Sequence, residues 1–370
     1  DRDVASQLAS HLEGLANALE ADLNSHRQLI IDTVLDCARS LHSKSTVYGT
    51  LVGLLNVADS SIGREIVEGA HRELQRALED HAPMAIRGLT RFVVALMNAR
   101  VASTASTVEV LETLLSAREE EGPIARADWF CAIVMDALVL CGKSLTADAP
   151  AALDALCSRL AEHVAQRKPL KKTAPLLLFY GTSTTSEEVI EHVDALYSVL
   201  TTMREDGGWS SPFLLAPHRA FAQQLSSSVA HSLPPITLEA HTPGCTYPAL
   251  DRLRLLPAPT EVDLGGRGTL VAPADRILIE EVSFMMVSAF SESHKDCAKL
   301  LVAMAEELGV DCSNLFVEVL FSSILMLPAP KHQQMYYASV MVDLCKLLQS
   351  VPIALERALN VLFAQVPRLD

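Results

Sequence analysis

The chain has 370 residues, 49% hydrophobic but only 5% aromatic, and a formal net charge of −15 at pH 7. This charge argues against direct electrostatic capture of nucleic acid, because tight non-specific binding typically needs several Lys or Arg contacts to phosphates. The eight cysteines form no CxxC pair and no uncharged apolar run approaches the ~18 residues of a membrane span, so we expect reduced thiols and no membrane contact.

Helical periodicity begins at the start of the chain and repeats. Apolar residues recur at helical spacing over 4–19 and again over 30–41, which predicts two consecutive helices. Further pairs are predicted to open near Ser45, at Pro83 and near Ile124, so the openings lie about 40 residues apart, close to the period of HEAT repeats. The predicted fold class is therefore all-α, a superhelix of antiparallel helical hairpins of the HEAT or armadillo type.

Two glycines lie inside the helix that is expected after Ser45. In a helix interior each glycine costs about 1 kcal/mol relative to alanine. Gly49 and Gly53 are four residues apart and share one helix face without side chains. We expect another helix to approach closely there, although a neutral position on an exposed face stays open as an alternative.

The second half of the first helical block carries further helix signals. Ser106 and Thr185 each precede a glutamate by three residues, the pattern of a capping box that begins a helix. A last helix of this block is predicted over 218–232.

A change in composition predicts the domain organisation. Residues 232–275 are dense in Pro and Gly and show no sustained period, as expected of a linker. We therefore predict a first helical-repeat domain over 1–233, an interdomain linker over 234–275 and the first part of a second helical-repeat domain over 276–370. Five helices are expected in the last part: 277–290, 297–308, 315–327, 335–348 and 353–366.

The sequence offers no recognisable reaction centre. HExxH, GxSxG, Walker and dinucleotide-binding motifs are absent, so we predict no enzyme, no catalytic residue, no cofactor and no metal. His294 and Cys297 have a spacing that could contribute two metal ligands, but no second pair accompanies them. An unrecognised hydrolase that uses a His and an acid remains an alternative, to be tested by substituting His218 or His294.

Several strings, in order along the chain, carry a resemblance. They are LEGLANALEADL, TVYGTLVGLLNV, RADWFCAIVM, HSLPPITL, TYPALDR, RILIEEV, LPAPKHQQMYY and DLCKLLQ. Together they resemble the N-terminal region of the large subunits of nuclear cap-binding complexes. That resemblance implies three consecutive helical-repeat domains, of which the first is similar to the middle domain of the large translation-initiation scaffold.

The resemblance also implies a function. In that family a small RNA-recognition-motif subunit holds the RNA cap, and the large subunit binds and orders this partner and recruits RNA export, splicing, processing and decay factors. It implies nuclear localisation with shuttling to the cytoplasm, and contact with capped RNA only through the small subunit. A related helical-repeat scaffold of translation initiation or nonsense-mediated decay is the alternative.

No cap-stacking residue can be assigned to this chain, because that motif belongs to the other subunit. For partner contact we select Tyr336 and Tyr337. Adjacent helical side chains point about 100° apart, and two large rings rarely both find a core position. The alternative is that both tyrosines pack between repeats.

Overall fold

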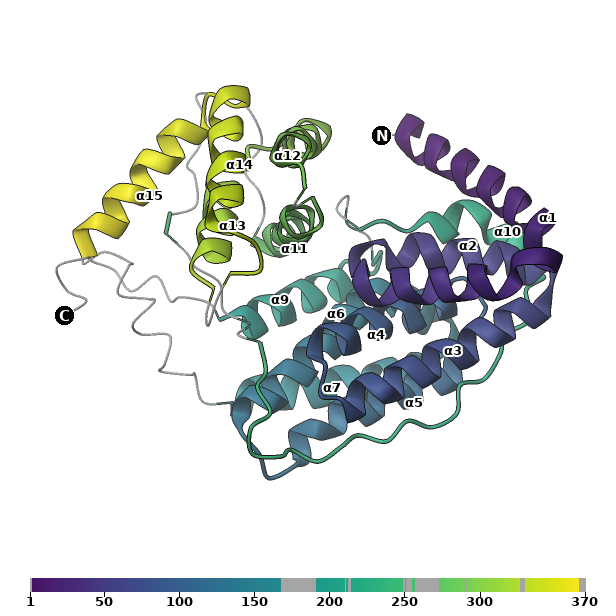
Figure 1. The fold of residues 1–370 in the computed structure, drawn as a ribbon. Helices are drawn as coiled ribbons and strands as arrows, with labels where there is room; N and C mark the ends of the chain where they lie inside the picture. Colours follow the sequence, from purple (N-terminus) through teal and green to yellow (C-terminus); the bar gives the residue numbers. More distant parts are fainter. Residues whose placement is uncertain are drawn as a thin grey trace. The chain divides into compact units, whose positions relative to one another are not determined.

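The computed structural model shows a chain of helices (Figure 1). It describes residues 2–167, 191–209, 211, 214–248, 250, 255–256, 273–290, 292–326 and 330–365. Within these ranges the structure contains helices and a single isolated bridge, between Ala102 and His231. The predicted all-α class is confirmed. The chain divides into two compact units, one of Asp1–Arg167 with Leu196–Ala249 and the other of Lys168–Ala195 with Leu250–Asp370.

The helices of the first unit follow the predicted repeat. They are α1 (Arg2–Ser40), α2 (Ser45–Ala58), α3 (Ser60–Glu79), α4 (Pro83–Asn98), α5 (Thr104–Leu115), α6 (Ile124–Asp148), α7 (Pro150–Gln166), α9 (His192–Glu205, from Leu196 onward) and α10 (Ala222–Leu225), with 3-10 turns η1 (His42–Lys44), η2 (Ser116–Glu119) and η4 (Pro217–Phe221). Non-helical backbone at His26 kinks α1, so two helical segments lie where two helices are predicted. Because α4 packs against both α2 and α6, the three opening helices of the repeats form one continuous layer.

The two glycines of α2 make the contact with α4 possible. A Cβ atom on Gly49 would lie 2.7 Å from the Cβ of Ala95 and 2.9 Å from its backbone oxygen. A Cβ on Gly53 would lie 2.9 Å from the Cβ of Ala99. All three distances are shorter than a real Cβ atom tolerates, so the expectation of a close helix approach at these glycines is confirmed.

The long apolar helix α6 forms the centre of the first unit. By length and composition it is the one helix of the described residues that could cross a membrane, yet 72% of its apolar window is buried inside the protein. Its two inner carboxylates, Asp128 and Asp136, are 2% and 5% exposed and both form ion pairs with arginines. These features are those of a core helix, whose buried charges need partners.

Two local predictions in the first unit are wrong. Helix α5 begins three residues before the position set by the expected capping box, because Ser103, in extended conformation, is the N-cap and its hydroxyl accepts from the Ser106 amide. The helix expected over 218–232 is only a 3-10 turn followed by the four-residue α10. There Ser226 and Ser227 donate to carbonyls three residues back, and the chain then becomes extended. Thr185 lies outside the described residues.

The second unit contains α11 (Pro273–Ala289), α12 (His294–Leu308), α13 (Ser313–Ile324), α14 (Gln334–Leu347) and α15 (Val351–Gln365). Each of these helices corresponds to one of the five predicted in this part of the sequence. Helix α12 packs on α14, and α13 packs on both α11 and α15. Gly309, with φ of 65°, ends α12 in the left-handed conformation that favours glycine.

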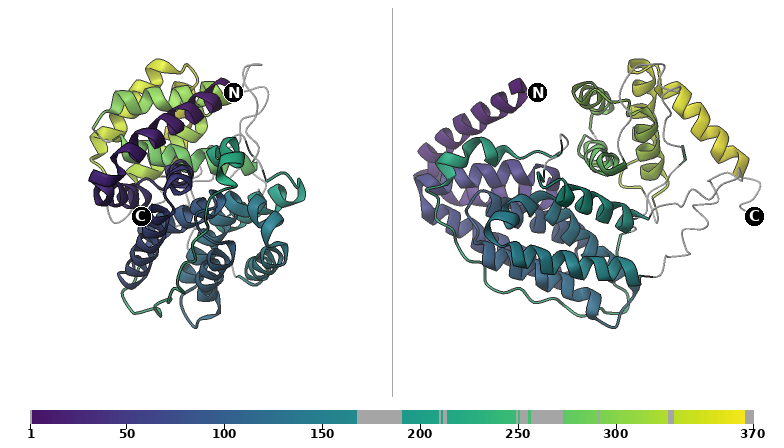
Figure 2. Two further views of the ribbon diagram at one scale, coloured as in Figure 1. Left: turned by 90° about the vertical axis from the view of Figure 1, so that its right-hand side faces the viewer. Right: turned by 180° about the vertical axis from the view of Figure 1, so that it is seen from behind.

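Parts of the predicted linker are held by hydrogen bonds. Residues 231–247, which we call the strap, run without helix along the first unit (Figures 1 and 2). In the second unit the backbone amides of Leu255 and Leu256 donate to Glu318, at 2.7 and 2.8 Å, and Arg276 pairs with the same carboxylate. The domain boundaries at 233 and 275 stay a prediction.

Candidate interaction surface

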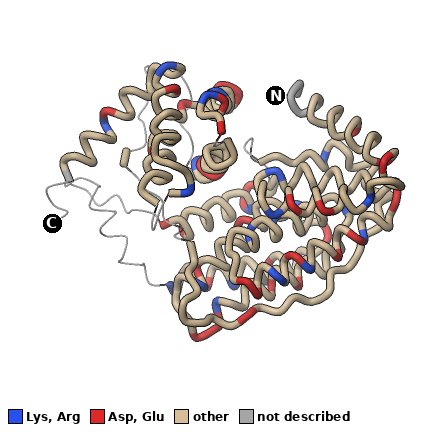
Figure 3. The backbone as a smooth tube through the Cα atoms, in the orientation of Figure 1, with Lys and Arg blue, Asp and Glu red and all other residues tan. Residues whose placement is uncertain are grey.

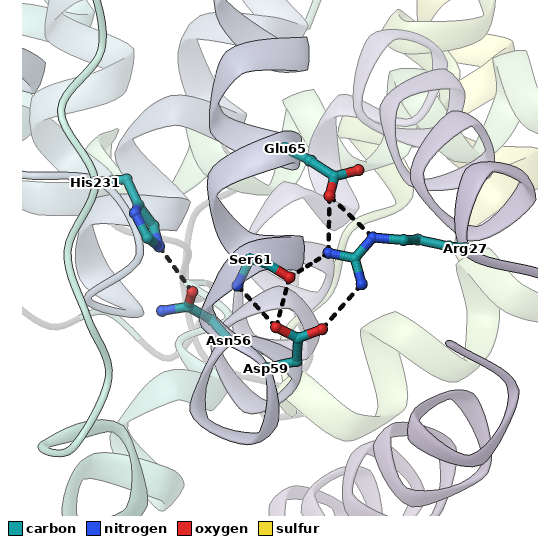
Figure 4. Close-up of polar contacts among 6 residues, drawn as sticks. All are labelled: Arg27, Asn56, Asp59, Ser61, Glu65 and His231. Atoms are coloured by element: carbon teal, nitrogen blue, oxygen red, sulfur yellow. Dashed lines mark hydrogen bonds and ion pairs between the residues drawn. The ribbon is translucent and has the colours of Figure 1, made fainter. Parts of the chain in front are cut away.

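The strap is attached at its beginning to the turn after α4. The amide of His231 donates to the Val101 carbonyl at 2.7 Å, and the amide of Ser103 donates to the His231 carbonyl at 2.8 Å. The His231 side chain is 8% exposed, and its Nε2 lies 3.0 Å from Oδ1 of Asn56 (Figure 4). Asn56 also donates through Nδ2 to the Val229 carbonyl. One amide side chain of α2 therefore fixes both the strap and the residues that lead into it.

The hydrogen bond to Asn56 fits a neutral His231. Burial lowers the pKa of His231, and the positive charge of Arg64 lowers it further. Because Nδ2 of Asn56 already donates, its Oδ1 is the acceptor and Nε2 of His231 is the donor.

A second polar cluster fixes the turn between α2 and α3 beside Asn56. Arg27 of α1 contacts Glu65 at 2.9 Å, Asp59 at 2.9 Å and Ser61 at 2.5 Å (Figure 4). Asp59 caps α3, and its pKa is lowered to about 2, first by hydrogen bonding from the Ser61 hydroxyl and then by Arg27. The cluster ties α1 to the first turn of α3.

The middle of the strap is bound through its backbone. Gln75 of α3 accepts the Thr237 amide at 2.9 Å and donates to the Thr237 carbonyl at 3.3 Å. The Leu233 amide donates to the Ser106 hydroxyl at 3.0 Å. Leu233 and Ile236 are 4% and 7% exposed, so apolar side chains enter the protein between these polar contacts.

The end of the strap is bound by Arg126 of α6, whose side chain is 2% exposed. Its guanidinium donates to the Glu239 carbonyl at 2.5 Å, to the Tyr247 hydroxyl at 2.9 Å and to Glu120 at 3.0 and 3.1 Å. The same group lies 5.0 Å from the ring centre of Phe130. The charge is thus neutralised by Glu120, and the remaining donors hold the strap.

Buried ion pairs on α6 join neighbouring helices. Asp136 pairs with Arg87 at 3.1 Å and Arg91 at 3.5 Å, both on α4. Asp128 pairs with Arg167 at 3.0 Å and contacts His163 of α7 at 2.8 Å. Several arginines of the first unit therefore form ion pairs with carboxylates inside the protein.

The histidines considered for chemistry lie in different surroundings. Burial, and then the charges of Arg219 and Lys143, lower the pKa of His218 to about 4. His294 lies 2.6 Å from Asp343, which also pairs with Lys346 at 2.9 Å. Cys297 is fully buried. Among the described residues no group of three or more His, Cys, Asp or Glu could hold a metal ion.

Both tyrosines selected for partner contact make internal contacts in the second unit. Tyr337 is 2% exposed and accepts the His332 amide at 3.1 Å. Tyr336 is half-buried and donates to the Val287 carbonyl at 2.9 Å. Their rings pack edge to face at 5.3 Å between centres. Their role in partner contact stays a prediction. The preceding residue, Met335, is 73% exposed.

The residues that bind the strap were not selected from the sequence. A signal was present for two of them, because Asn56 and Arg126 are polar residues in predominantly apolar helices. Gln75 gave no such signal, because the residues around it on the same helix face are mostly polar.

Comparisons with known proteins agree with this architecture. The model of the family described as MIF4G domain matches residues 4–193, and the one described as MIF4G like matches 271–370. Nuclear cap-binding protein subunit 1 of Salmo salar is 31% identical over 367 residues, which cover 99% of this chain and 46% of that protein. The proteins of the same name from Mus musculus and Homo sapiens are each 30% identical over 368 residues, with the same coverage. The chain thus spans about half the length of these curated relatives, and it belongs to the MIF4G domain family.

Proposed function

We propose that this chain is part of the large, scaffold subunit of a nuclear cap-binding complex. The observation that carries the proposal is 30–31% identity over 99% of the chain to proteins named nuclear cap-binding protein subunit 1. In this role the protein binds and orders a small RNA-recognition-motif subunit on capped RNA. It then recruits RNA processing, export and decay factors, is nuclear and shuttles to the cytoplasm. We propose no catalytic step.

The charge distribution supports contact with RNA through a partner. The net charge is −15, and Lys and Arg are interspersed with Asp and Glu along the helices of the first unit (Figure 3). Arg87, Arg126 and Arg167 are paired with carboxylates inside the protein. Phosphate binding at these three arginines would have to break the pairs, so these side chains are poorly suited to hold RNA.

A scaffold of this kind acts by shifting a population. If it binds only the ordered, cap-competent form of its partner, the apparent cap affinity rises by the factor by which that form is enriched. No contact between scaffold and cap is needed. For contact with the small subunit we keep Tyr336 and Tyr337 as a proposal, in the first turn of α14 where Met335 is exposed.

The experiment is to purify the complete protein from cell extract and identify what it binds stoichiometrically. An RNA-recognition-motif protein that is retained on immobilised cap analogue together with the scaffold supports the proposal. An RNA helicase retrieved without any cap-binding subunit contradicts it and favours the related scaffold of translation initiation or nonsense-mediated decay.

A further inference from the structure

The contacts of the strap are those by which a protein binds an extended peptide. Gln75 pairs with both the amide and the carbonyl of Thr237, although the Thr237 side chain is exposed. Ser106 and Arg126 likewise contact strap backbone atoms, the Leu233 amide and the Glu239 carbonyl. Such contacts fix the position of an extended backbone and do not depend on which side chains it carries.

Specificity comes from a short apolar pattern. The side chains of Leu233 and Ile236 are buried, whereas Pro234 and Pro235 between them are exposed. Two consecutive prolines favour an extended backbone and lower the entropy lost on binding. Leu238 then lines a small cavity whose other walls include Trp129 and Phe130. A segment with apolar residues at the positions of Leu233, Ile236 and Leu238 would fit the same surface.

The helices beneath the strap also pack directly on one another. The packing of α2, α3, α4 and α6 against one another does not pass through it. Ten of its 17 residues are exposed, and the polar contacts that hold it come from single side chains of separate helices. The indole N–H of Trp129, which is 3% exposed, has no acceptor among the described residues. A competing peptide whose carbonyl reached this group would gain a hydrogen bond that the strap does not make.

We propose that Asn56, Gln75, Ser106 and Arg126 form a peptide-binding groove that the strap occupies in cis. The partner is a protein that presents an extended segment with apolar residues on either side of a Pro-Pro pair, and it binds by displacing the strap. This inference goes beyond the scaffold role proposed above and does not depend on which complex the protein joins.

The test uses a fluorescent peptide with the sequence of residues 229–248 and measures its anisotropy with the whole chain. We expect weak binding to the unaltered chain, because the tethered strap competes at an effective concentration near the millimolar range. The double variant Leu233→Asp, Ile236→Asp weakens the strap but leaves the groove intact. It should bind the peptide at least 10-fold more tightly.

Matched controls locate the binding. Adding Gln75→Leu to the double variant should remove most of its gain in peptide affinity. Adding Gln28→Leu instead, at an exposed glutamine of α1, should leave that affinity unchanged. A peptide that carries Asp at positions 233 and 236 should not bind. Equal binding to the unaltered chain and the double variant, or binding insensitive to Gln75→Leu, would overturn the proposal.

A second measurement does not require any variant to fold. Excess peptide with Ile236→Val, whose fragments differ in mass from those of the chain, is added to the unaltered protein during hydrogen exchange. We expect faster exchange of the chain's own amides at His231, Leu233 and Thr237 and unchanged exchange in α4. Unchanged exchange in the strap at saturating peptide would overturn it.

Discussion

Replacing Gly49 by alanine tests the helix packing that underlies the whole first unit. The new Cβ would lie 2.7 Å from the Cβ of Ala95 and 2.8 Å from its backbone carbon, and the backbone cannot move aside as a side-chain end can. Overpacking of this kind costs about 1–3 kcal/mol, whereas removing a helical glycine returns about 1 kcal/mol. The exposed Gly14 of α1 is the matched control, since a Cβ there meets nothing within 4 Å.

Comparing the two variants cancels the helix-propensity gain and leaves the steric cost. We expect Gly49→Ala to have a free energy of unfolding about 1–3 kcal/mol lower than Gly14→Ala. The assay is urea unfolding followed by tryptophan fluorescence. Both tryptophans, Trp129 and Trp209, are 3% exposed and belong to the first unit, so the signal reports that unit alone. Equal stability of the two variants would refute the close packing of α2 on α4.

Three further predictions concern buried polar groups. Asp136→Ala should lower the free energy of unfolding by about 3–5 kcal/mol, because it removes the carboxylate that pairs with two arginines of α4. The control Asp154→Ala, at an exposed ion pair, should lower it by less than about 1 kcal/mol. Urea unfolding of the two variants measures both values. His218 has a folded-state pKa of about 4, below its unfolded value of 6.5, so the unfolded state takes up the proton first as the pH falls. Stability of the first unit should therefore decrease below about pH 6.5, by about 2 kcal/mol at pH 5 from this group, and His218→Gln should remove that part of the pH dependence. A thiol reagent at pH 8 should modify native protein at no more than three of the eight cysteines. The other five are buried, namely Cys131, Cys141, Cys157, Cys297 and Cys312.

The repeat architecture was predictable because it depends on the hydrophobic pattern within each segment of the sequence. A hydrophobic face that recurs about every 40 residues can be buried only by stacking neighbouring hairpins. Gly49 and Gly53 added a specific contact, since a glycine pair on one helix face has a structural meaning that does not depend on its distant partner.

The errors arose where a contact distant in sequence decides the local structure. Ser103 and Ser106 compete for the cap of α5, and Ser106 is instead occupied by the Leu233 amide, 127 residues away. The chain after Leu225 leaves the helix because His231 pairs with the backbone of Val101. Neither partner is visible in a local window.

The candidate surface was less predictable than the fold. Its binding residues, Asn56, Gln75, Ser106 and Arg126, come from four helices and converge only when the repeats stack. Tyr336 and Tyr337 were selected from helix geometry, which gives the angle between two rings but not the pocket beside them. In the structure the backbone carbonyl of Val287 and the amide of His332 satisfy both hydroxyls.

The central claim is that the protein contributes to cap recognition without binding the cap itself. The most direct measurement is a fluorescence titration of a methylated-guanosine cap analogue against the complete protein, first alone and then with the proposed RNA-recognition-motif partner. We expect no saturable binding to the protein alone and tight binding once the partner is present. Saturable binding of the analogue by the isolated protein would contradict it.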